Sequence, residues 1–190
     1  MAFPSINDID NWIIAKAADP AGNWLLQTFG VSPYLVASRL FIATVACAFL
    51  YLAVEITYRL TSYSPEKVVT LSMGILVSLF FVTLVTQNNR PLAEKMAAKD
   101  LAWREGRLSS SMLKDPVNLY RRFMTLVVLV IFSPLILANF FKELDMSTQA
   151  SILLNSVFIL ELVAHYLAAC SVPPAHTVRR GRLAEAGGAA

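Results

Sequence analysis

The stretch VVTLSMGILVSLFFVTLVT, residues 68–86, decides the fold class, because it is apolar throughout and carries no charged residue. A helix needs about 20 residues to cross a bilayer at a rise of about 1.5 Å per residue. Three further stretches have comparable length and composition: residues 34–58, 123–141 and 150–170. Together they predict an all-α, polytopic membrane protein with four transmembrane helices.

The composition of the whole chain agrees with this fold class. Of the 190 residues, 56% are hydrophobic and 15% are charged, whereas a soluble domain has roughly 45–50% apolar and about 25% charged residues. The mean hydropathy is +0.57. The two cysteines, Cys47 and Cys170, do not form the framework of a disulfide-rich secreted fold. The composition therefore excludes an ordinary water-soluble domain.

The segments outside these stretches predict the domain organisation. Residues 1–33 form an amphipathic arm on the cytoplasmic face, residues 34–182 form the four-helix bundle, and residues 183–190 form a disordered tail. The connection over residues 87–122 is long and charged, and we expect it to be cytoplasmic. A separate loop helix is predicted there, beginning at Asn89-Arg90-Pro91 and running to about Leu108.

The arm carries signals for helix boundaries and for membrane contact. Ser5 followed by Asp8 predicts a capping box, Asp19-Pro20 predicts a break, and Gly30 predicts an end. Trp12 and Trp24 are candidate interface anchors, since tryptophan settles at headgroup depth. We interpret the arm as one or two helices lying on the membrane surface, and the alternative is a helix docked on the chain's own loop.

The distribution of Lys and Arg predicts the orientation. Twelve of them fall on the side of the arm, the middle loop and the tail, and three fall on the other side. Arg39 lies one turn inside the first span and can reach the headgroups of the twelve-charge side. The positive-inside rule then places both termini in the cytoplasm, in a multi-pass protein of the bacterial inner (plasma) membrane.

A candidate polar site lies on the fourth predicted span, where Glu161 is followed four residues later by His165. Glu161 is near the middle of its apolar stretch, so its carboxyl must be protonated, hydrogen-bonded or open to water. In one interpretation it joins helices by bonding Thr44, Ser78 or Ser133, each near the middle of its own span. In the other, Glu161 and His165 handle a proton or a ligand.

The motifs favour a protein without catalytic activity. No serine lies with a histidine and an acid at matched depth, and no set of metal ligands or nucleotide-binding glycines is present. We therefore expect no enzyme activity, no cofactor, no metal and no nucleic-acid partner. The leading interpretation is an accessory or scaffold subunit of a larger membrane complex, in contact with lipid and with membrane-protein partners or further copies of itself.

Two alternatives to this function stay open. The first is a small transporter, channel or holin-like pore former that uses Glu161 and His165 as a proton-linked gate. The second, a membrane enzyme or quinone-binding electron-transfer subunit, has less in its favour, because the predicted spans hold a single histidine. Flux in liposomes separates the first alternative from an accessory subunit.

The predicted orientation can be tested with single cysteines at Ser62 and Ser109, in a background without Cys47 and Cys170. A membrane-impermeant maleimide added to intact cells should label Ser62→Cys and leave Ser109→Cys unlabelled, because the positive-inside rule places the two positions on opposite sides. Permeabilised cells serve as the control for reactivity. External labelling of Ser109→Cys alone would reverse the orientation.

Overall fold

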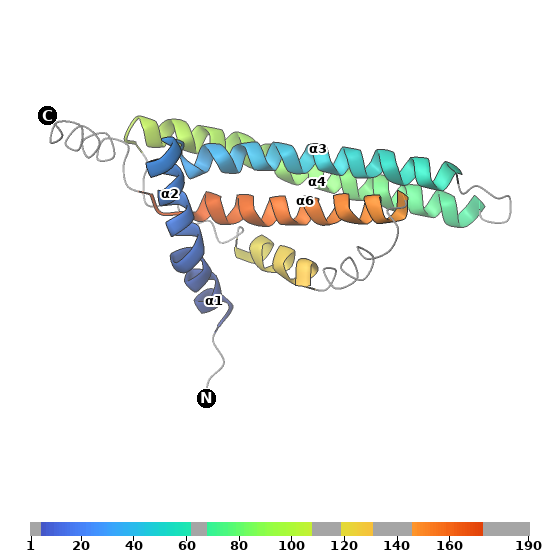
Figure 1. Ribbon diagram of the computed structural model, residues 1–190, viewed down its shortest axis with the longest axis horizontal. Helices are drawn as coiled ribbons and strands as arrows, with labels where there is room; N and C mark the ends of the chain where they lie inside the picture. Colours follow the sequence, from blue (N-terminus) through green and yellow to red (C-terminus); the bar gives the residue numbers. More distant parts are fainter. Residues whose placement is uncertain (1–4, 62–67, 108–118, 131–145, 173–190) are drawn as a thin grey trace, which may run out of the picture. The chain divides into compact units, whose positions relative to one another are not determined.

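The computed structural model describes residues 5–61, 68–107, 119–130 and 146–172, and its regular segments are all helical (Figure 1). In chain order they are α1 (Ile6–Ile13), the π-helical turn η1 (Ile14–Ala18), α2 (Asp19–Phe29), α3 (Pro33–Thr61), α4 (Val68–Arg104) and α6 (Met146–Ala169). Residues 119–130 are also helical. The predicted all-α class is confirmed.

Within the described residues, three helices are long and apolar enough to cross a membrane: α3, α4 and α6, the last over Thr148–Ala169. They correspond to three of the four predicted spans and indicate a multi-pass membrane protein. The remaining prediction, residues 123–141, is helical as far as residue 130, and the rest of it lies outside the described residues. A fourth span is therefore not shown, and the predicted tail over residues 183–190 also lies outside the described part.

The N-terminal arm is helical without interruption from Ile6 to Phe29, which corrects the predicted break at Asp19-Pro20. The capping box is confirmed, since the Ser5 side chain accepts from the Asp8 backbone N–H while the Asp8 carboxylate accepts from Ser5. These hydrogen bonds hold the pKa of Asp8 below its usual value. At Asp19-Pro20 the chain passes through η1 straight into α2, because proline is well tolerated in the first turn of a helix.

The arm ends where the sequence predicts. Gly30 closes α2 with φ of 66° and ψ of 18°, a left-handed conformation that costs glycine little. Its backbone N–H donates to the carbonyl of Leu26 at 3.0 Å. The chain then turns at Val31 and Ser32 into α3, whose first residue is Pro33.

Helix α4 differs from the prediction, because it runs without interruption from Val68 to Arg104. The expected loop helix beginning at Asn89 is thus the second half of α4, with Pro91 inside it. Proline in a helix interior costs about 3 kcal/mol. Burial of Leu92, Ala93 and Met96 directly after Pro91 offsets that cost. At about 1.5 Å per residue the helix is far longer than a bilayer is thick, so part of α4 lies beyond the hydrocarbon.

The end of α4 has a physical explanation in Gly106, which has φ of 70°. Its backbone N–H donates to the carbonyl of Trp103 at 3.1 Å, and Arg107 N–H donates to the carbonyl of Ala102 at 2.8 Å. This pair of hydrogen bonds is the Schellman motif, which satisfies the last carbonyl groups of a helix. The loop helix was expected to reach about Leu108, and the glycine ends it earlier.

The chain divides into two compact units, and the long helices contribute to both. The first unit comprises Met1–Ser38, Glu94–Phe123 and Ala164–Ala190. It holds α1, η1, α2 and one end each of α3, α4 and α6. Its apolar core is formed by Leu26 of α2, Tyr34 of α3 and Trp103 of α4, with Val172 packed against them. The arm is therefore part of a folded unit.

The second unit comprises Arg39–Ala93 and Met124–Val163. In it α3 packs antiparallel to α4 and α6, which run in the same direction (Figure 1). The core combines Ala48 of α3, Val82 and Val85 of α4 and Val157 of α6. Phe81 extends this core, since the centre of its ring lies 5.9 Å from the ring centre of Tyr51 and 5.8 Å from the ring centre of Phe158.

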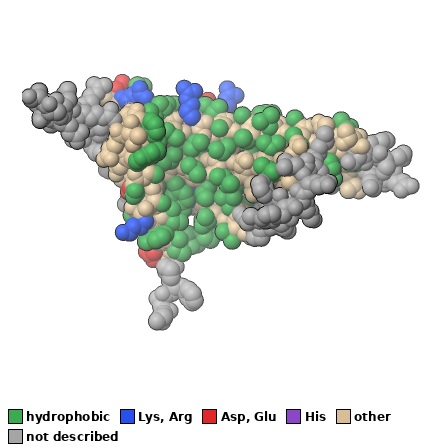
Figure 2. Space-filling model, viewed as in Figure 1, with side chains coloured by type: hydrophobic (Ala, Val, Ile, Leu, Met, Phe, Trp, Pro, Cys, Tyr) green, Lys and Arg blue, Asp and Glu red, His purple; other side chains and the backbone are tan. Residues whose placement is uncertain are grey.

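The buried residues of α3 and α4 follow alternating steps of three and four, the spacing that keeps one stripe of a helix facing its neighbours. On α4 the stripe is Ser78, Val82, Val85, Asn89, Leu92, Met96, Lys99 and Trp103, and on α3 it is Tyr34, Ala37, Phe41, Thr44 and Ala48, with Glu55 two steps further on. The opposite faces expose large apolar side chains such as Phe49, Val69 and Phe80, and hydrophobic side chains cover much of the face seen in Figure 2. Such faces suit contact with lipid.

The core of the second unit generates a prediction at Ala48, which is fully buried. Ala48→Leu should lower the stability of the protein by about 1–3 kcal/mol, because an interior at native density cannot take a larger side chain without strain. Ala46→Leu, at an exposed position of the same helix, is the matched control and should be close to neutral. Thermal unfolding in detergent measures both, and equal stabilities would contradict the packing described.

Candidate functional site

The two ionisable groups that the sequence singled out both lie on α6. Glu161 is half-buried and belongs to the second unit, whereas His165 is fully buried and belongs to the first. They are four residues apart on one helix, as predicted. Ser133, in the third predicted span, lies outside the described residues. The role of Glu161 and His165 as a pair stays a prediction.

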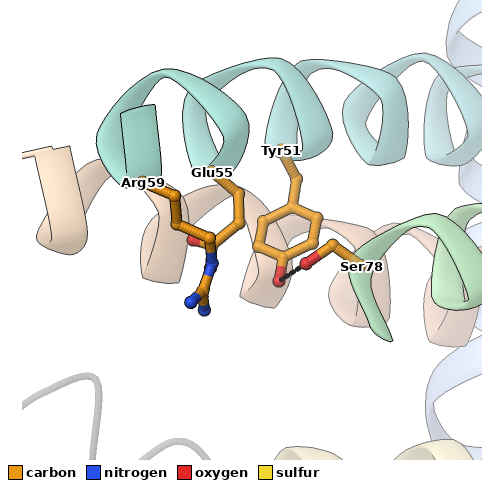
Figure 3. Close-up of polar contacts among 4 residues, drawn as sticks. All are labelled: Tyr51, Glu55, Arg59 and Ser78. Carbon is orange, nitrogen blue, oxygen red and sulfur yellow. Dashed lines mark hydrogen bonds and ion pairs between the residues drawn. The ribbon is translucent and has the colours of Figure 1, made fainter. Parts of the chain in front are cut away.

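Two of the hydroxyl groups predicted to bond Glu161, those of Ser78 and Thr44, have hydrogen bonds to other groups in the structure. Ser78 of α4 lies 3.2 Å from the hydroxyl of Tyr51 on α3, and the two groups share a hydrogen bond (Figure 3). Thr44 donates to the carbonyl of Leu40, one turn earlier in α3, at 2.9 Å. Both side chains are buried. Ser78 therefore joins α3 to α4. The Thr44 hydroxyl donates its proton within α3, and its oxygen can still accept a hydrogen bond.

Asn89 is a buried polar residue at a position where the sequence predicts only a helix start. It is fully buried, and neither its amide nitrogen nor its amide oxygen has a hydrogen-bond partner in the described part of the chain. It lies on the α4 stripe, one step after Val85. The stripe spacing could have revealed it, had α4 been read as one helix beyond Thr86.

A charged pair lies near the other end of α3, within the second unit. The guanidinium of Arg59 donates to the Glu55 carboxylate through Nε at 2.6 Å and Nη2 at 2.5 Å, in an i,i+4 pair within one helix. Figure 3 shows both side chains on the same face of α3 as Tyr51. The guanidinium also lies directly against Gly74 of α4, where a Cβ would overlap it. Gly74 thus leaves room for the ion pair.

The first unit contains an ion pair that the sequence did not predict. Arg122 donates to Asp10 of α1 through Nε at 2.9 Å and Nη2 at 2.5 Å, and both side chains are less than a tenth exposed. The guanidinium also lies 5.6 Å from the ring centre of Tyr166 on α6. A bidentate pair of this kind is geometrically specific. It docks α1 on the residues that precede the third predicted span, which is the alternative the sequence left open for the arm.

Two more buried charges lie one turn before the end of α4. Lys99 donates to the carbonyl of Ala168 at 3.0 Å and lies 4.8 Å from the ring centre of Tyr34. Asp100 accepts from the Ser32 hydroxyl and pairs with Arg104 at 2.8 Å, also in an i,i+4 arrangement. A cation is favourable beside the last carbonyl groups of a helix, where the dipole is negative. Lys99 therefore caps α6.

The residues after α6 are fastened on several sides. The Cys170 carbonyl accepts from the Tyr34 hydroxyl at 2.9 Å, and its thiol donates to the carbonyl of Ala18 at 2.9 Å. The Ser171 backbone N–H donates to Asp19 at 2.7 Å. Burial raises the pKa of the Cys170 thiol to about 12, so the thiol is neutral at pH 7. These contacts are structural.

The predicted interface anchors are all exposed. The side chains of Trp12 and Trp24 are 64% and 56% exposed, and Arg39 is exposed on α3. Exposure of such large aromatic side chains suits a membrane interface or a partner surface. Their insertion into headgroups stays a prediction.

The buried charged side chains of the described residues join helices to one another, and they do not form a cluster of reacting groups. Among residues 5–61, 68–107, 119–130 and 146–172, no cluster of three His, Cys, Asp or Glu side chains could hold a metal ion. The buried charges Asp10, Lys99, Asp100 and Arg122 are each engaged by a neighbouring group. Comparisons with protein-family models, curated proteins and solved structures find no match to this chain. Function is therefore inferred from these residues alone.

The Asp10–Arg122 pair generates a prediction about stability. Arg122→Met should cost about 3–5 kcal/mol, because it leaves the Asp10 charge buried without its partner. The double variant Asp10→Leu with Arg122→Met should recover most of that loss, since no uncompensated charge remains. Arg107→Met breaks the exposed pair with Glu105 and should cost about 1 kcal/mol or less. Equal losses for Arg122→Met and Arg107→Met in detergent unfolding would contradict a buried pair.

Proposed function

We propose that this chain is a non-enzymatic accessory or scaffold subunit of a larger complex in the inner (plasma) membrane. The observation that supports it most is the use of the buried charges. Asp10, Lys99 and Arg122 each tie one helix of the first unit to another. Charges engaged in this way hold helices together and are poorly placed to react with a substrate.

The outward faces of the long helices support the same function. Val69, Val77 and Phe80 on α4 and Ile159 on α6 are exposed apolar side chains within candidate spans. Residues of this kind contact lipid, and they can equally pack against the apolar helices of a partner. The exposed Trp12 and Trp24 add aromatic groups on the arm, and aromatic residues are enriched at protein interfaces.

A subunit role predicts protein crosslinks from the exposed face in native membranes. A photoreactive phenylalanine analogue at Phe80 should give adducts of discrete mass containing one partner protein, because that side chain points away from the chain's own core. The same analogue at Val82, which is buried in the core, is the matched control and should give only crosslinks within the chain. Lipid adducts alone at Phe80, Val77 and Ile159 would contradict the proposal.

The alternative of a proton-linked transporter or pore is favoured by one observation, the buried and unpartnered amide of Asn89 on the stripe of α4. Reconstitution into liposomes with a pH-sensitive dye separates the two functions. An accessory subunit should leave the proton leak of the vesicles unchanged. Proton flux that requires the protein and is lost in Glu161→Gln would replace the subunit role with the transport role.

A further inference from the structure

The unpartnered amide of Asn89 is the feature of the second unit that calls for a ligand. The residue is fully buried, and its amide nitrogen and oxygen have no hydrogen-bond partner among the described residues. Buried polar groups in proteins are almost always hydrogen-bonded, either to protein or to ordered water. A group that fills this gap has to accept from the amide nitrogen and donate to the amide oxygen.

The direction of the Asn89 side chain follows from its neighbours on the stripe. Ser78 bonds Tyr51 of α3, and Val82 and Val85 pack in the core with residues of α3 and α6. Asn89 continues the same alternation of three and four residues, and it is as fully buried as the middle of that core. It therefore points into the space between α3, α4 and α6 within the second unit.

The packing also shows which residues share the level of Asn89. Ala48, Val85 and Val157 meet in one core cluster. Helix α3 runs antiparallel to α4 and α6. A step of four residues toward the N-terminus of α3 from Ala48 therefore has the same direction as a step of four residues toward the C-terminus of α4 from Val85 or of α6 from Val157. These steps end at Thr44, Asn89 and Glu161. Each step is about 6 Å along a helix, so the three side chains lie at one level of the unit.

The outer surface of α4 at this level is polar. Gln87, Asn88 and Arg90 flank Asn89 and are exposed, and they follow directly on the charge-free stretch over residues 68–86. This change of composition places the boundary of the hydrocarbon at the level of Asn89. Water is therefore present outside the helices at the depth where Thr44, Asn89 and Glu161 lie inside.

We propose that Thr44, Asn89 and Glu161 form a buried hydrated site in the second unit, and that its ligand is bound water. Water matches the two needs of the Asn89 amide, because one molecule donates and accepts at once. Thr44 donates its own proton to Leu40 and so offers an acceptor to the water. A bare metal cation fits less well, since it would leave the amide nitrogen of Asn89 without an acceptor.

The site goes beyond the role of an accessory subunit and does not depend on it. A carboxyl group that contacts bound water belongs to a hydrated environment, although it lies on an apolar helix. Glu161 is then oriented by Thr44 and Asn89 through the water. From the sequence, Glu161 was expected to bond hydroxyl groups of other helices. The hydrated site adds Asn89, whose amide binds the water.

The test compares cysteines on the α4 stripe in a background in which Cys47 and Cys170 are alanine. Asn89→Cys should react with silver ion, which is small and water-borne. Val85→Cys and Leu92→Cys, one step away on either side and both buried, are the matched controls. Position 89 should react at least ~10-fold faster, because a thiol in apolar surroundings forms little thiolate. Equal rates at the three positions would overturn the site.

A second measurement uses the unmodified sequence, so that a variant that fails to fold does not decide the outcome. In lipid bilayers, solid-state NMR can follow magnetisation from water to the side-chain amide of Asn89. The signal is assigned by its absence from Asn89→Asp, and the exposed Asn88 gives the reference for full hydration. Early transfer to Asn89 supports bound water, and transfer as late as to the Val85 methyl groups contradicts it. Neither result bears on partner crosslinking from Phe80.

Discussion

The cost of burying a charge is the constraint on which the first unit depends. Asp10 and Arg122 are both almost fully buried, and each is tolerable only because the other is there. The pair fixes α1 against the helix over residues 119–130, and the aromatic face of Tyr166 brings α6 to the same guanidinium. Lys99 obeys the same rule with a different partner, the carbonyl end of α6. Left without its partner, any of these buried charges would lower the stability of the first unit.

Features that depend on neighbouring residues could be predicted from the sequence. The capping box at Ser5, the glycine end of α2 and the pairs Glu55–Arg59 and Asp100–Arg104 all join residues within one or two turns. The apolar stretches over α3, α4 and α6 were equally readable, because a bilayer requires a minimum length of apolar helix. Each rests on a spacing that a single helix imposes.

Features that join distant parts of the chain escaped the sequence analysis. Nothing in the local pattern connects Asp10 with Arg122, or Lys99 with Ala168, since those partners are chosen by packing. The continuity of α4 escaped for another reason. A proline preceded by polar residues favours a helix start, and only the burial of Leu92 and Met96 beyond it keeps the helix intact. Tertiary contacts overrode a local signal there.

The depth of Glu161 shows how the same limit affects a functional reading. Judged by the apolar stretch over residues 150–170, the carboxyl lies near the midplane. Helix α6 in fact begins at Met146, so Glu161 lies past its centre. In the hydrated site proposed above, Glu161 lies level with Asn89, whose neighbours on the outer face of α4 are polar. The depth of a residue in a membrane is thus set by the packed helices together. A carboxyl group that a single helix would place in hydrocarbon can contact water when polar residues of neighbouring helices lie at the same level.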